Sequence, residues 1–562
     1  MIPVVLLAVL AFFGGLGRGA IGDNDEAFYA ESAREMVESG DWITPHFNYE
    51  PRFQKPALYY WLTAALFAVA GPDEFLARLW SALAGVGLVL VTTSCGRRWY
   101  DESVGLLAGA IAATSVGYFA VSRMALPDLP LAFSVTAATW AIFVATLERE
   151  RNPREWLFYA AVATALGFLV KGPLAIVLPL VVVVPILLME RRSYNVQFSD
   201  VVLAALLLFA IASPWYLVMW MRHGNEYLTG FFVGDNYERF ATSRFNDPRP
   251  WWFYLPIAAG GLLPWTPMML MWLGPVLQFV TRRRDVGTVD LRLVLWALIP
   301  LAFFTLSVGK QPRYILPVLP PLAILLAASV IERTSEWRSL DGARRRPRPN
   351  TAVVFGCVLG GLFLTLLGVL LYRAQPLFID VPPLGTLFVA SVIALCGIAV
   401  IAVSFTGAWR SAPGMLAFAT AIAFAVLPYG AVASSTHSPV VQMADRINAA
   451  YQPGDAIGTY KVFVRNLAFY THRQHTDIIH DVHFRDWLVQ HQHVLVIMPA
   501  DDADRLEKSG WKMQRLAERR YFNEGALKVR MLLWPEPETD LERVVLARIT
   551  TGPPDSAKSS QD

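Results

Sequence analysis

Long apolar stretches, separated by short polar connections, dominate the pattern of this chain. Thirteen of them come close to the roughly 20 residues that a helix needs to cross about 30 Å of hydrocarbon. The predicted spans are residues 2–20, 76–96, 103–121, 129–147, 156–170, 173–189, 200–220, 251–280, 292–308, 314–331, 351–372, 385–404 and 414–434. The first stretch lacks the basic start of a signal peptide, so we interpret it as an anchor. The pattern predicts an α-helical polytopic membrane protein over residues 1–434.

After about residue 435 the apolar runs shorten to the length of strands. Strands are predicted at Asp455–Val462, His493–Met498 and Ala526–Trp534, and helices at Val440–Ala450, Phe484–Gln492 and Ala503–Ser509. Strands that alternate with helices favour a small α/β domain, which we place at residues 435–549. The final residues, 550–562, are polar and are predicted to be disordered.

Basic residues in the connections between spans predict the orientation, because short cytoplasmic loops are enriched in Lys and Arg. Alternate connections carry Arg97-Arg98, then Arg149, Arg151 and Arg154, then Arg191-Arg192, then Arg282-Arg283-Arg284, then the cluster from Arg333 to Arg348, and then Arg410. All of them fall on one side if the N-terminus is cytoplasmic. The opposite side then receives the loops at 21–75, 122–128, 221–250 and 309–313 together with the C-terminal domain.

Composition agrees with a membrane protein and excludes several other classes. Charged residues make up 17% of the chain and hydrophobic residues 55%, against about 25% charged residues in soluble domains. A net charge of +3, with basic residues only in short clusters, argues against nucleic-acid binding. The three cysteines, Cys95, Cys357 and Cys396, lie in apolar runs without metal-ligand spacing. Six histidines between His472 and His493 also lack such spacing, so we interpret them as surface residues and predict no metal site.

Candidate chemistry begins in the first outer loop. Asn24 can cap a helix from Asp25 to about Glu38 that ends at Gly40. On this helix Asp25, Phe28, Tyr29 and Ser32 share one face through their i, i+3, i+4 and i+7 spacing. Taken alone, Asp25 and Glu26 could simply be acids that the helix dipole favours in a first turn.

The other outer loops favour a functional site. Asp128 stands at the start of the fourth span, and Lys55, Lys171, Lys310 and Arg313 lie in outer connections where the positive-inside rule disfavours cations. Each cation alone could be an anchor whose charge reaches the membrane surface. Several cations together with two carboxylates on one face instead predict a site for an anionic substrate, such as a phosphate-linked lipid in a group-transfer reaction. The cations would neutralise a leaving phosphate, and a carboxylate would orient or deprotonate the nucleophile.

The first-loop sequence Asp25-Glu-Ala-Phe-Tyr-Ala-Glu-Ser-Ala-Arg-Glu-Met-Val-Glu-Ser-Gly-Asp-Trp-Ile-Thr-Pro-His strongly resembles the signature of bacterial aminoarabinose transferases. These enzymes belong with the protein O-mannosyltransferase-like GT-C glycosyltransferases. The likeness continues, in the order of the family, through Phe53-Gln-Lys-Pro, Leu126-Pro-Asp, Lys171-Gly, Ser213-Pro-Trp, Arg239-Phe, Leu263-Pro-Trp and Gly309-Lys-Gln-Pro-Arg-Tyr-Ile-Leu. It covers about 300 residues from the N-terminus.

The resemblance implies a transferase in the bacterial inner membrane with a periplasmic active site. Such an enzyme moves 4-amino-4-deoxy-L-arabinose from undecaprenyl phosphate to a lipid A phosphate, which protects against polymyxin-like cationic peptides. Carried over by motif, Asp25 is the catalytic carboxylate, with Asp128 and Lys55 beside it. The implied donor-phosphate contacts are Lys310, Arg313, Tyr314 and Lys171, and the implied cavity residues are Glu26, Tyr29, Gln54, Asn236 and Arg239. No cofactor is assigned, and the need for a divalent metal is left open.

Three positions depart from the usual family pattern. Phe28 stands where the family usually has Arg, Gln54 where it usually has Glu, and Asn236 where it often has His. These exchanges leave open another sugar, or another acceptor such as an envelope glycan or a protein hydroxyl. A lipid or solute transporter is the non-enzyme alternative. A transporter predicts paired charges near mid-span and repeated halves, whereas the charges here cluster at one face.

Overall fold

The computed structural model describes residues 1–550 except 23–24, 149, 151, 191–195, 244–247, 273–286, 336–348, 463, 492 and 524–527. Several predicted features lie outside the described residues: the Asn24 cap, Arg149, Arg151, Arg191-Arg192, Arg282-Arg283-Arg284, most of the cluster before Arg348, and residues 551–562 of the predicted tail.

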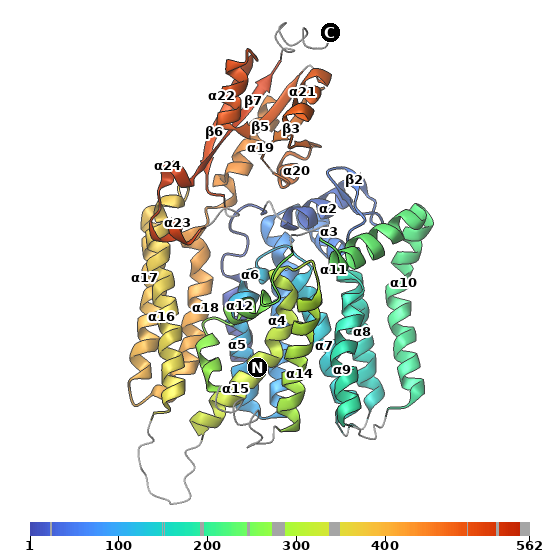
Figure 1. Cartoon of the computed structure of the whole chain (residues 1–562), viewed down its shortest axis with the longest axis vertical. Helices are drawn as coiled ribbons and strands as arrows, with labels where there is room; N and C mark the ends of the chain where they lie inside the picture. The colour runs from blue at the N-terminus through green and yellow to red at the C-terminus, as the bar shows by residue number, and fades with distance from the viewer. Residues whose placement is uncertain are drawn as a thin grey trace, which may run out of the picture.

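A bundle of apolar helices makes up most of the molecule (Figure 1). In the described part of the chain, eight helical stretches are long and apolar enough to cross a membrane, and a pair bent by 55° makes a ninth. These stretches contain α4 (Glu74–Trp99), α7 (Asp128–Leu147), α10 (Phe198–Leu228), α14 (Thr288–Leu306), α15 (Leu319–Ser335), α16 (Thr351–Ala374), α17 (Pro383–Ser404) and α18 (Ala412–Ala431), and the bent pair is α5 (Glu102–Ala113) with α6 (Val116–Ser122). The chain is thus a multi-pass membrane protein, and the count of thirteen spans stays a prediction.

Further helices belong to the bundle, and those at Pro153–Lys171 and Leu174–Glu190 agree within a few residues with the predicted spans 156–170 and 173–189. These further helices are α1 (Ile2–Phe13), α3 (Leu58–Ala70), α8 (Pro153–Lys171), α9 (Leu174–Glu190) and α12 (Tyr254–Gly261). The first predicted span was too long, because the helix ends at Phe13 and a glycine-rich strap, residues 14–20, follows it. Gly15 and Gly19 in this strap have positive φ, which favours glycine. The predicted outer loop 21–75 contains α3, an apolar helix too short to be recognised as a span.

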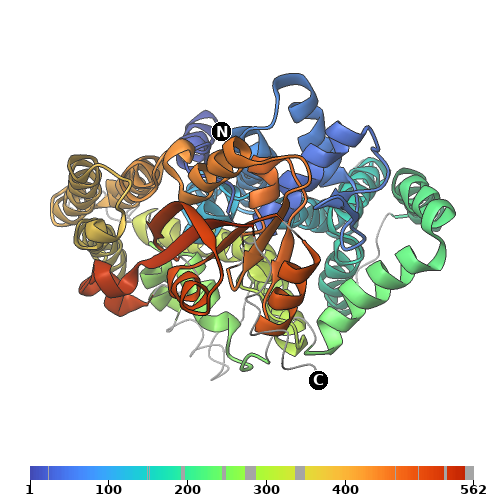
Figure 2. The same ribbon diagram turned by 90° about the horizontal axis from the view of Figure 1, so that it is seen from above.

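The C-terminal unit is built on a five-stranded sheet with the order β4-β3-β5-β7-β6. Its strands are β3 (Ala456–Tyr460), β4 (Thr476–Ile478), β5 (Val494–Pro499), β6 (Met513–Tyr521) and β7 (Glu542–Ile549). β3 runs parallel to β4 and β5, whereas β7 is antiparallel to β5 and β6. The surrounding helices are α19 (Pro439–Ala450), α20 (Leu467–Thr471), α21 (Asp481–Gln490), α22 (Ala500–Lys508) and α24 (Pro537–Asp540). Seen from above, the unit lies over the middle of the bundle (Figure 2).

Two of the three predicted strands and all three predicted helices are present in this unit, within a few residues of their predicted bounds. The strand predicted at Ala526–Trp534 was wrong, because its described part forms the helix α23 (Val529–Leu533). Met531 of this helix is buried against Leu377 and Leu541, and Arg373 donates to the carbonyl of Leu533 at 2.8 Å. The apolar run therefore docks the unit on the end of α16 instead of joining the sheet. The domain boundary at 434/435 stays a prediction.

Two glycines allow α16 and α17 to pack closely. A Cβ on Gly397 would lie 2.3 Å from the carbonyl oxygen of Gly361 and 2.4 Å from Oγ1 of Thr365. Contacts this short require the helices to move apart. Small residues at helix crossings allow such close packing in membranes, where association depends on van der Waals contact.

We therefore expect Gly397→Ala to lower the free energy of unfolding of the purified chain by about 1–3 kcal/mol, as overpacking commonly does, and so to lower its melting temperature. Gly385→Ala is the matched control, because a Cβ there meets nothing within 4 Å on the same helix. The measurement is the melting temperature in detergent, taken from the amount of folded protein that size-exclusion chromatography recovers after heating. A Gly397→Ala variant that melts with the wild type would contradict this account of the packing.

Candidate active site

The strap after α1 is held by guanidinium groups that satisfy its free carbonyls. Nη1 of Arg123 donates to the carbonyl of Gly14 at 2.6 Å, and Nη2 of Arg78 donates to that of Ala20 at 2.8 Å. Arg78 is buried and also forms an ion pair with Glu26 at 2.8 Å. Backbone N–H groups of Gly22 and Ala125 donate to the same carboxylate. Glu26 thus ties the first turn of α2 (Asp25–Ser39) to α4 and to the loop that precedes α7, and through Arg78 to the strap.

Burial raises the pKa of Glu26, but Arg78 and the two backbone donors outweigh it, so that the pKa lies below its usual value. The carboxylate is therefore charged and fully bonded at neutral pH. The predicted cavity residue Glu26 accordingly lies in a structural ion pair that fixes its neighbour, Asp25.

Asp25 meets Asp128 across a single guanidinium group. Arg313, in the 3-10 segment Pro312–Val318, forms an ion pair with Asp25, and its Nε lies 3.3 Å from Oδ1 of Asp128. Nζ of Lys171 lies 2.5 Å from the same Oδ1 of Asp128. Asp128 is buried, whereas Asp25 is half-exposed. The first loop, the start of α7, the end of α8 and the 309–313 loop therefore converge at one point.

A second ion-pair cluster lies on the π-helical segment Thr229–Glu238. Lys55 forms an ion pair with Asp235, and Nη2 of Arg239 lies 2.6 Å from Oδ1 of the same carboxylate. Asp235 is buried and precedes Arg239 by four residues, which places both on one helical face. The two clusters are adjacent, because Lys171 and Arg239 are both within electrostatic reach of Lys55.

The remaining predicted residues take several positions around these clusters. Tyr314 lies under Lys171, whose Nζ is 5.1 Å from the ring centroid. Tyr29 is buried and stacks on Tyr60 at 5.5 Å. Lys310 is buried and donates to the backbone carbonyl of Arg249 at 3.3 Å, rather than to either cluster.

Two of the departures from the family pattern also have defined surroundings. Asn236 donates to the carbonyl of Phe231 at 2.8 Å within its own helical segment. Gln54 is exposed, and its carbonyl accepts from Lys55 at 2.8 Å.

The charges of the two clusters do not cancel. The four cations are Lys55, Lys171, Arg239 and Arg313, and the three carboxylates are Asp25, Asp128 and Asp235. Burial together with the neighbouring cations lowers the pKa of Lys55 well below its usual value. An anion bound here would relieve the repulsion among the cations, so the arrangement fits a phosphate group beside Asp25.

Asp235 was missed by reasoning from the sequence, although a signal was present. It lies in an outer loop, four residues before Arg239, within Gly234-Asp-Asn-Tyr-Glu-Arg. Arg78 gave no signal, because an Arg at the start of a predicted span resembles an ordinary surface anchor.

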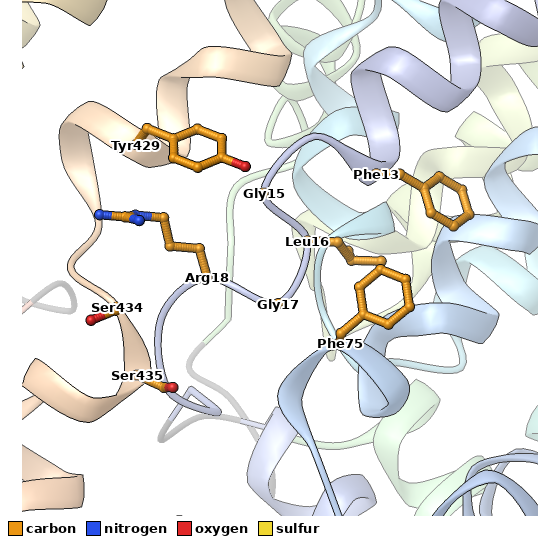
Figure 3. A pocket seen from close by; sticks show the side chains of 9 residues that line it. All are labelled: Phe13, Gly15, Leu16, Gly17, Arg18, Phe75, Tyr429, Ser434 and Ser435. Atoms are coloured by element: carbon orange, nitrogen blue, oxygen red, sulfur yellow. The ribbon is translucent and has the colours of Figure 1, made fainter. Parts of the chain in front are cut away.

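A pocket among the described residues lies elsewhere. It has a volume of about 420 Å³ and is formed by the strap, the start of α4 and the end of α18 (Figure 3). Its lining residues are Phe13, Gly15, Leu16, Gly17, Arg18, Phe75, Tyr429, Ser434 and Ser435. None of the residues predicted for the active site lines it, so we do not assign the chemistry to this pocket.

No group of three or more His, Cys, Asp or Glu side chains suited to holding a metal ion occurs among the residues that the structure describes. The clusters around Asp25 consist of carboxylates already paired with cations, which does not favour a divalent metal there. We therefore derive no step through a metal.

Comparisons with known proteins show which families this chain resembles. A family model described as dolichyl-phosphate-mannose-protein mannosyltransferase matches residues 20–223. An undecaprenyl phosphate-alpha-4-amino-4-deoxy-L-arabinose arabinosyl transferase 2 from Pseudomonas fluorescens is 35% identical over 312 residues, which are 55% of this chain and 52% of the relative. A corresponding transferase from Pseudomonas aeruginosa is 36% identical over 312 residues, or 55% of each chain. The matched region spans about half the length of these curated relatives.

Solved structures extend the likeness over the whole chain. The crystal structure of ArnT from Cupriavidus metallidurans bound to undecaprenyl phosphate superposes with a TM-score of 0.71 at 21% identity and covers 97% of both chains. The archaeal oligosaccharyltransferase AglB from Archaeoglobus fulgidus, in complex with an inhibitory peptide and a dolichol-phosphate, gives a TM-score of 0.52 at 12% identity and covers 89% of this chain and 68% of its own.

The chain therefore has the polytopic fold of the GT-C glycosyltransferases, with a small C-terminal α/β unit. Within that class, 312 residues of the chain are 35% and 36% identical to the two aminoarabinose transferases, and the resemblance predicted from the first-loop motif is confirmed.

The first loop also contains a group of acids that does not face the ion-pair clusters. Glu31 and Arg34 are buried on α2 and form an ion pair at 2.7 Å. Glu35 is buried beside them and accepts from the backbone N–H of Tyr49 through both oxygens, at 3.1 and 3.0 Å. Burial, followed by the charge of Glu31, raises the pKa of Glu35 to about 8. The folded chain thus retains a proton that an unfolded Glu releases near pH 4.3.

We expect the free energy of unfolding to decrease as the pH rises from about 5 to about 8, because over this range the folded state binds more protons than the unfolded state. Glu35→Gln keeps this side chain neutral and should reduce the decrease. Glu38→Gln is the control. Burial raises the pKa of Glu38, but the hydrogen bond and charge of Arg34 outweigh burial, so that this pKa lies below its usual value. The Glu38→Gln variant should therefore lose stability with rising pH as the wild type does. Melting temperatures at several pH values test this, and an equal decrease in the Glu35→Gln variant would contradict it.

Proposed function

We propose that this chain is an inner-membrane glycosyltransferase that moves a sugar from undecaprenyl phosphate to a lipid A phosphate. The observation that carries the proposal is the cation-rich pair of clusters at the start of α2, where Arg313 joins Asp25 to Asp128. The names of the relatives support the substrates. The fold shared with a structure that binds undecaprenyl phosphate supports a polyprenyl-phosphate donor. The sugar proposed is 4-amino-4-deoxy-L-arabinose.

The proposed reaction is a displacement at the anomeric carbon of the donor sugar. An oxygen of the acceptor phosphate forms a bond to that carbon while the bond from the carbon to the donor phosphate oxygen breaks. The electron pair of the broken bond stays on undecaprenyl phosphate, where Lys55, Arg239 and Arg313 would stabilise the negative charge. A phosphate acceptor is already ionised at neutral pH, so Asp25 would mainly orient groups and balance charge. A protein hydroxyl would need Asp25 as a general base.

The proposed orientation places the N-terminus in the cytoplasm and the active site and C-terminal unit in the periplasm. Asp128 begins α7, and Glu148, just after the end of α7, lies 2.5 Å from Arg98 at the end of α4. Arg292, which is buried, and Glu190 form another ion pair where α14 begins and α9 ends. The described basic residues at this end of the bundle support a cytoplasmic side there.

The transfer is tested by mixing purified full-length chain with lipid A and a synthetic undecaprenyl-phosphate-linked aminoarabinose. We expect mass spectrometry to show lipid A carrying one added pentose-sized sugar on phosphate. Asp25→Asn should reduce the rate by about 10²-fold or more, because it removes a group that orients the reactants, with normal membrane yield. Sugar found only on protein Ser or Thr would contradict the lipid A acceptor. Full activity of Asp25→Asn would contradict the role of this carboxylate.

A second prediction concerns the donor site. Lys55→Met removes a cation that we assign to the donor phosphate, so its affinity for undecaprenyl phosphate should fall about 10- to 100-fold, as expected for one charged hydrogen bond. Lys512→Met is the control, because Lys512 is exposed on the C-terminal unit. Binding measured in detergent micelles checks this. Equal affinity in the two variants would assign Lys55 to a structural role with Asp235.

A further inference from the structure

Two guanidinium groups lie over one aromatic ring beside the candidate active site. Phe28 follows Asp25 by one helical turn on the same face of α2. The guanidinium carbon of Arg52 lies 3.9 Å from the centroid of the Phe28 ring, and that of Arg465 lies 5.2 Å from it. The ring of Phe47 packs edge-on against the ring of Phe28, with 4.6 Å between the two centroids. The cations come from elements that are far apart in the sequence, so the fold itself brings them together.

The short hairpin of the first loop places Arg52. Its strands, β1 (His46–Phe47) and β2 (Glu50–Pro51), are antiparallel, and Asn48 at their turn has positive φ. The backbone N–H of Arg52 donates to the carbonyl of Pro45 at 2.8 Å. Nε of Arg52 is buried and has no hydrogen-bond partner in the described part of the chain. A buried guanidinium donor without a partner is costly unless a ligand satisfies it.

The C-terminal unit places Arg465 by fixing the residues that follow it. Nδ2 of Asn466 donates to the carbonyl of Ile21 at 2.7 Å, and the hydroxyl of Tyr470 accepts from the N–H of Ile21 at 2.7 Å. The Tyr470 hydroxyl also donates to Glu74 at 3.0 Å. In Figure 1, α20 lies directly above α2. Arg465 therefore lies on a segment that is anchored to the start of the first loop, within a few residues of Asp25.

The hairpin turn strengthens this docking from the other side. Asn48 exchanges two hydrogen bonds with the backbone of His475, at 2.7 and 3.0 Å, and the hydroxyl of Tyr49 donates to the carbonyl of His472 at 2.9 Å. The segment 465–475 is thus held at both ends against the first loop.

The two cations meet at the ring of Phe28, and Arg52 is also within electrostatic reach of Lys55 in the donor clusters. Phe28 lies one helical turn beyond Asp25, whose carboxylate pairs with Arg313. Arg52 and Arg465 therefore form a positive patch one helical turn from the proposed reaction centre. A transfer between two phosphates needs such a second anion subsite, because donor and acceptor both carry negative charge.

We propose that Arg52 and Arg465 bind the phosphomonoester of the acceptor, with Phe28 as the platform on which both guanidinium groups lie. This proposal rests on the proposed function and assigns its acceptor side. Guanidinium groups suit a phosphate because they can donate two parallel hydrogen bonds to it. The C-terminal unit thus takes part in acceptor recognition through a residue that contacts the substrate.

The test measures binding of lipid A to the full chain in detergent, without donor, and then transfer kinetics. Arg465→Gln and Arg52→Gln should each weaken the binding of bisphosphorylated lipid A at least tenfold and raise the acceptor KM, and Arg465→Gln should leave the donor KM unchanged. Arg465→Lys should restore part of the affinity. Arg473→Gln is the matched control, because Arg473 lies on the same segment but packs over Tyr451, with its guanidinium carbon 3.8 Å from the ring centroid.

Two further arms identify the ligand. Dephosphorylated lipid A should bind weakly to the wild type and equally weakly to Arg465→Gln. Inorganic phosphate should compete with lipid A for the wild type. Competition only at high phosphate concentration means that the lipid part also contributes to binding, and competition at low concentration means that the phosphate alone is recognised. Both results support the subsite.

The subsite is overturned if Arg465→Gln, shown to be folded by its melting temperature, binds bisphosphorylated lipid A as tightly as the wild type does. It is also overturned if the wild type does not bind this lipid. If binding depends on Arg465 but no sugar is transferred from any charged carrier lipid, the proposed function fails while the subsite stands.

Discussion

The guanidinium of Arg313 is the interaction on which the arrangement of the site depends. It lies between Asp25 on the first-loop helix and Asp128 at the start of α7. A buried carboxylate such as Asp128 is tolerated only when cations and hydrogen bonds compensate for the loss of water, and here Arg313 and Lys171 both do so. Because Lys171 ends α8 and Arg313 lies in the 3-10 segment after α14, pairing both with one carboxylate brings these elements to a single point.

The second constraint on the first loop is the need to satisfy the backbone carbonyls of the strap. The strap 14–20 has no helix to satisfy its carbonyls, and Arg78 and Arg123 donate to several of them. Arg78 then needs an anion, which Glu26 provides. The residue next to the proposed catalytic carboxylate is therefore part of a buried network, and the position of Asp25 follows from the packing of the bundle. The C-terminal segment 465–475 holds the same loop from above.

The sequence predicted the apolar bundle well, because long apolar runs report directly on helices that lie in a membrane. It also indicated Asp25, Asp128, Lys171 and Arg313, because charges at the ends of apolar helices stand out. It could not separate Glu26 from Asp25, since both look like first-turn acids and only the position of Arg78 distinguishes them. Arg465 lies more than 400 residues from Phe28, so no local pattern connects the two residues.

Some elements were wrong or missed for related physical reasons. The run at Ala526–Trp534 has strand-like composition, but tertiary contacts with Leu377 and Leu541 make its described part a helix. The break between α5 and α6 and the early end of α1 are local backbone choices inside continuous apolar sequence, which hydropathy does not detect.

The central claim is that the cations around Asp25 hold the donor phosphate. The most direct measurement is a cryo-electron microscopy structure of the full chain with undecaprenyl phosphate. The account predicts density for the phosphate within hydrogen-bond distance of Lys55, Arg239 or Arg313, and a side chain of Asp25 that faces it. Phosphate density in the pocket beside Arg18 and Tyr429, with the clusters around Asp25 empty, would contradict the account.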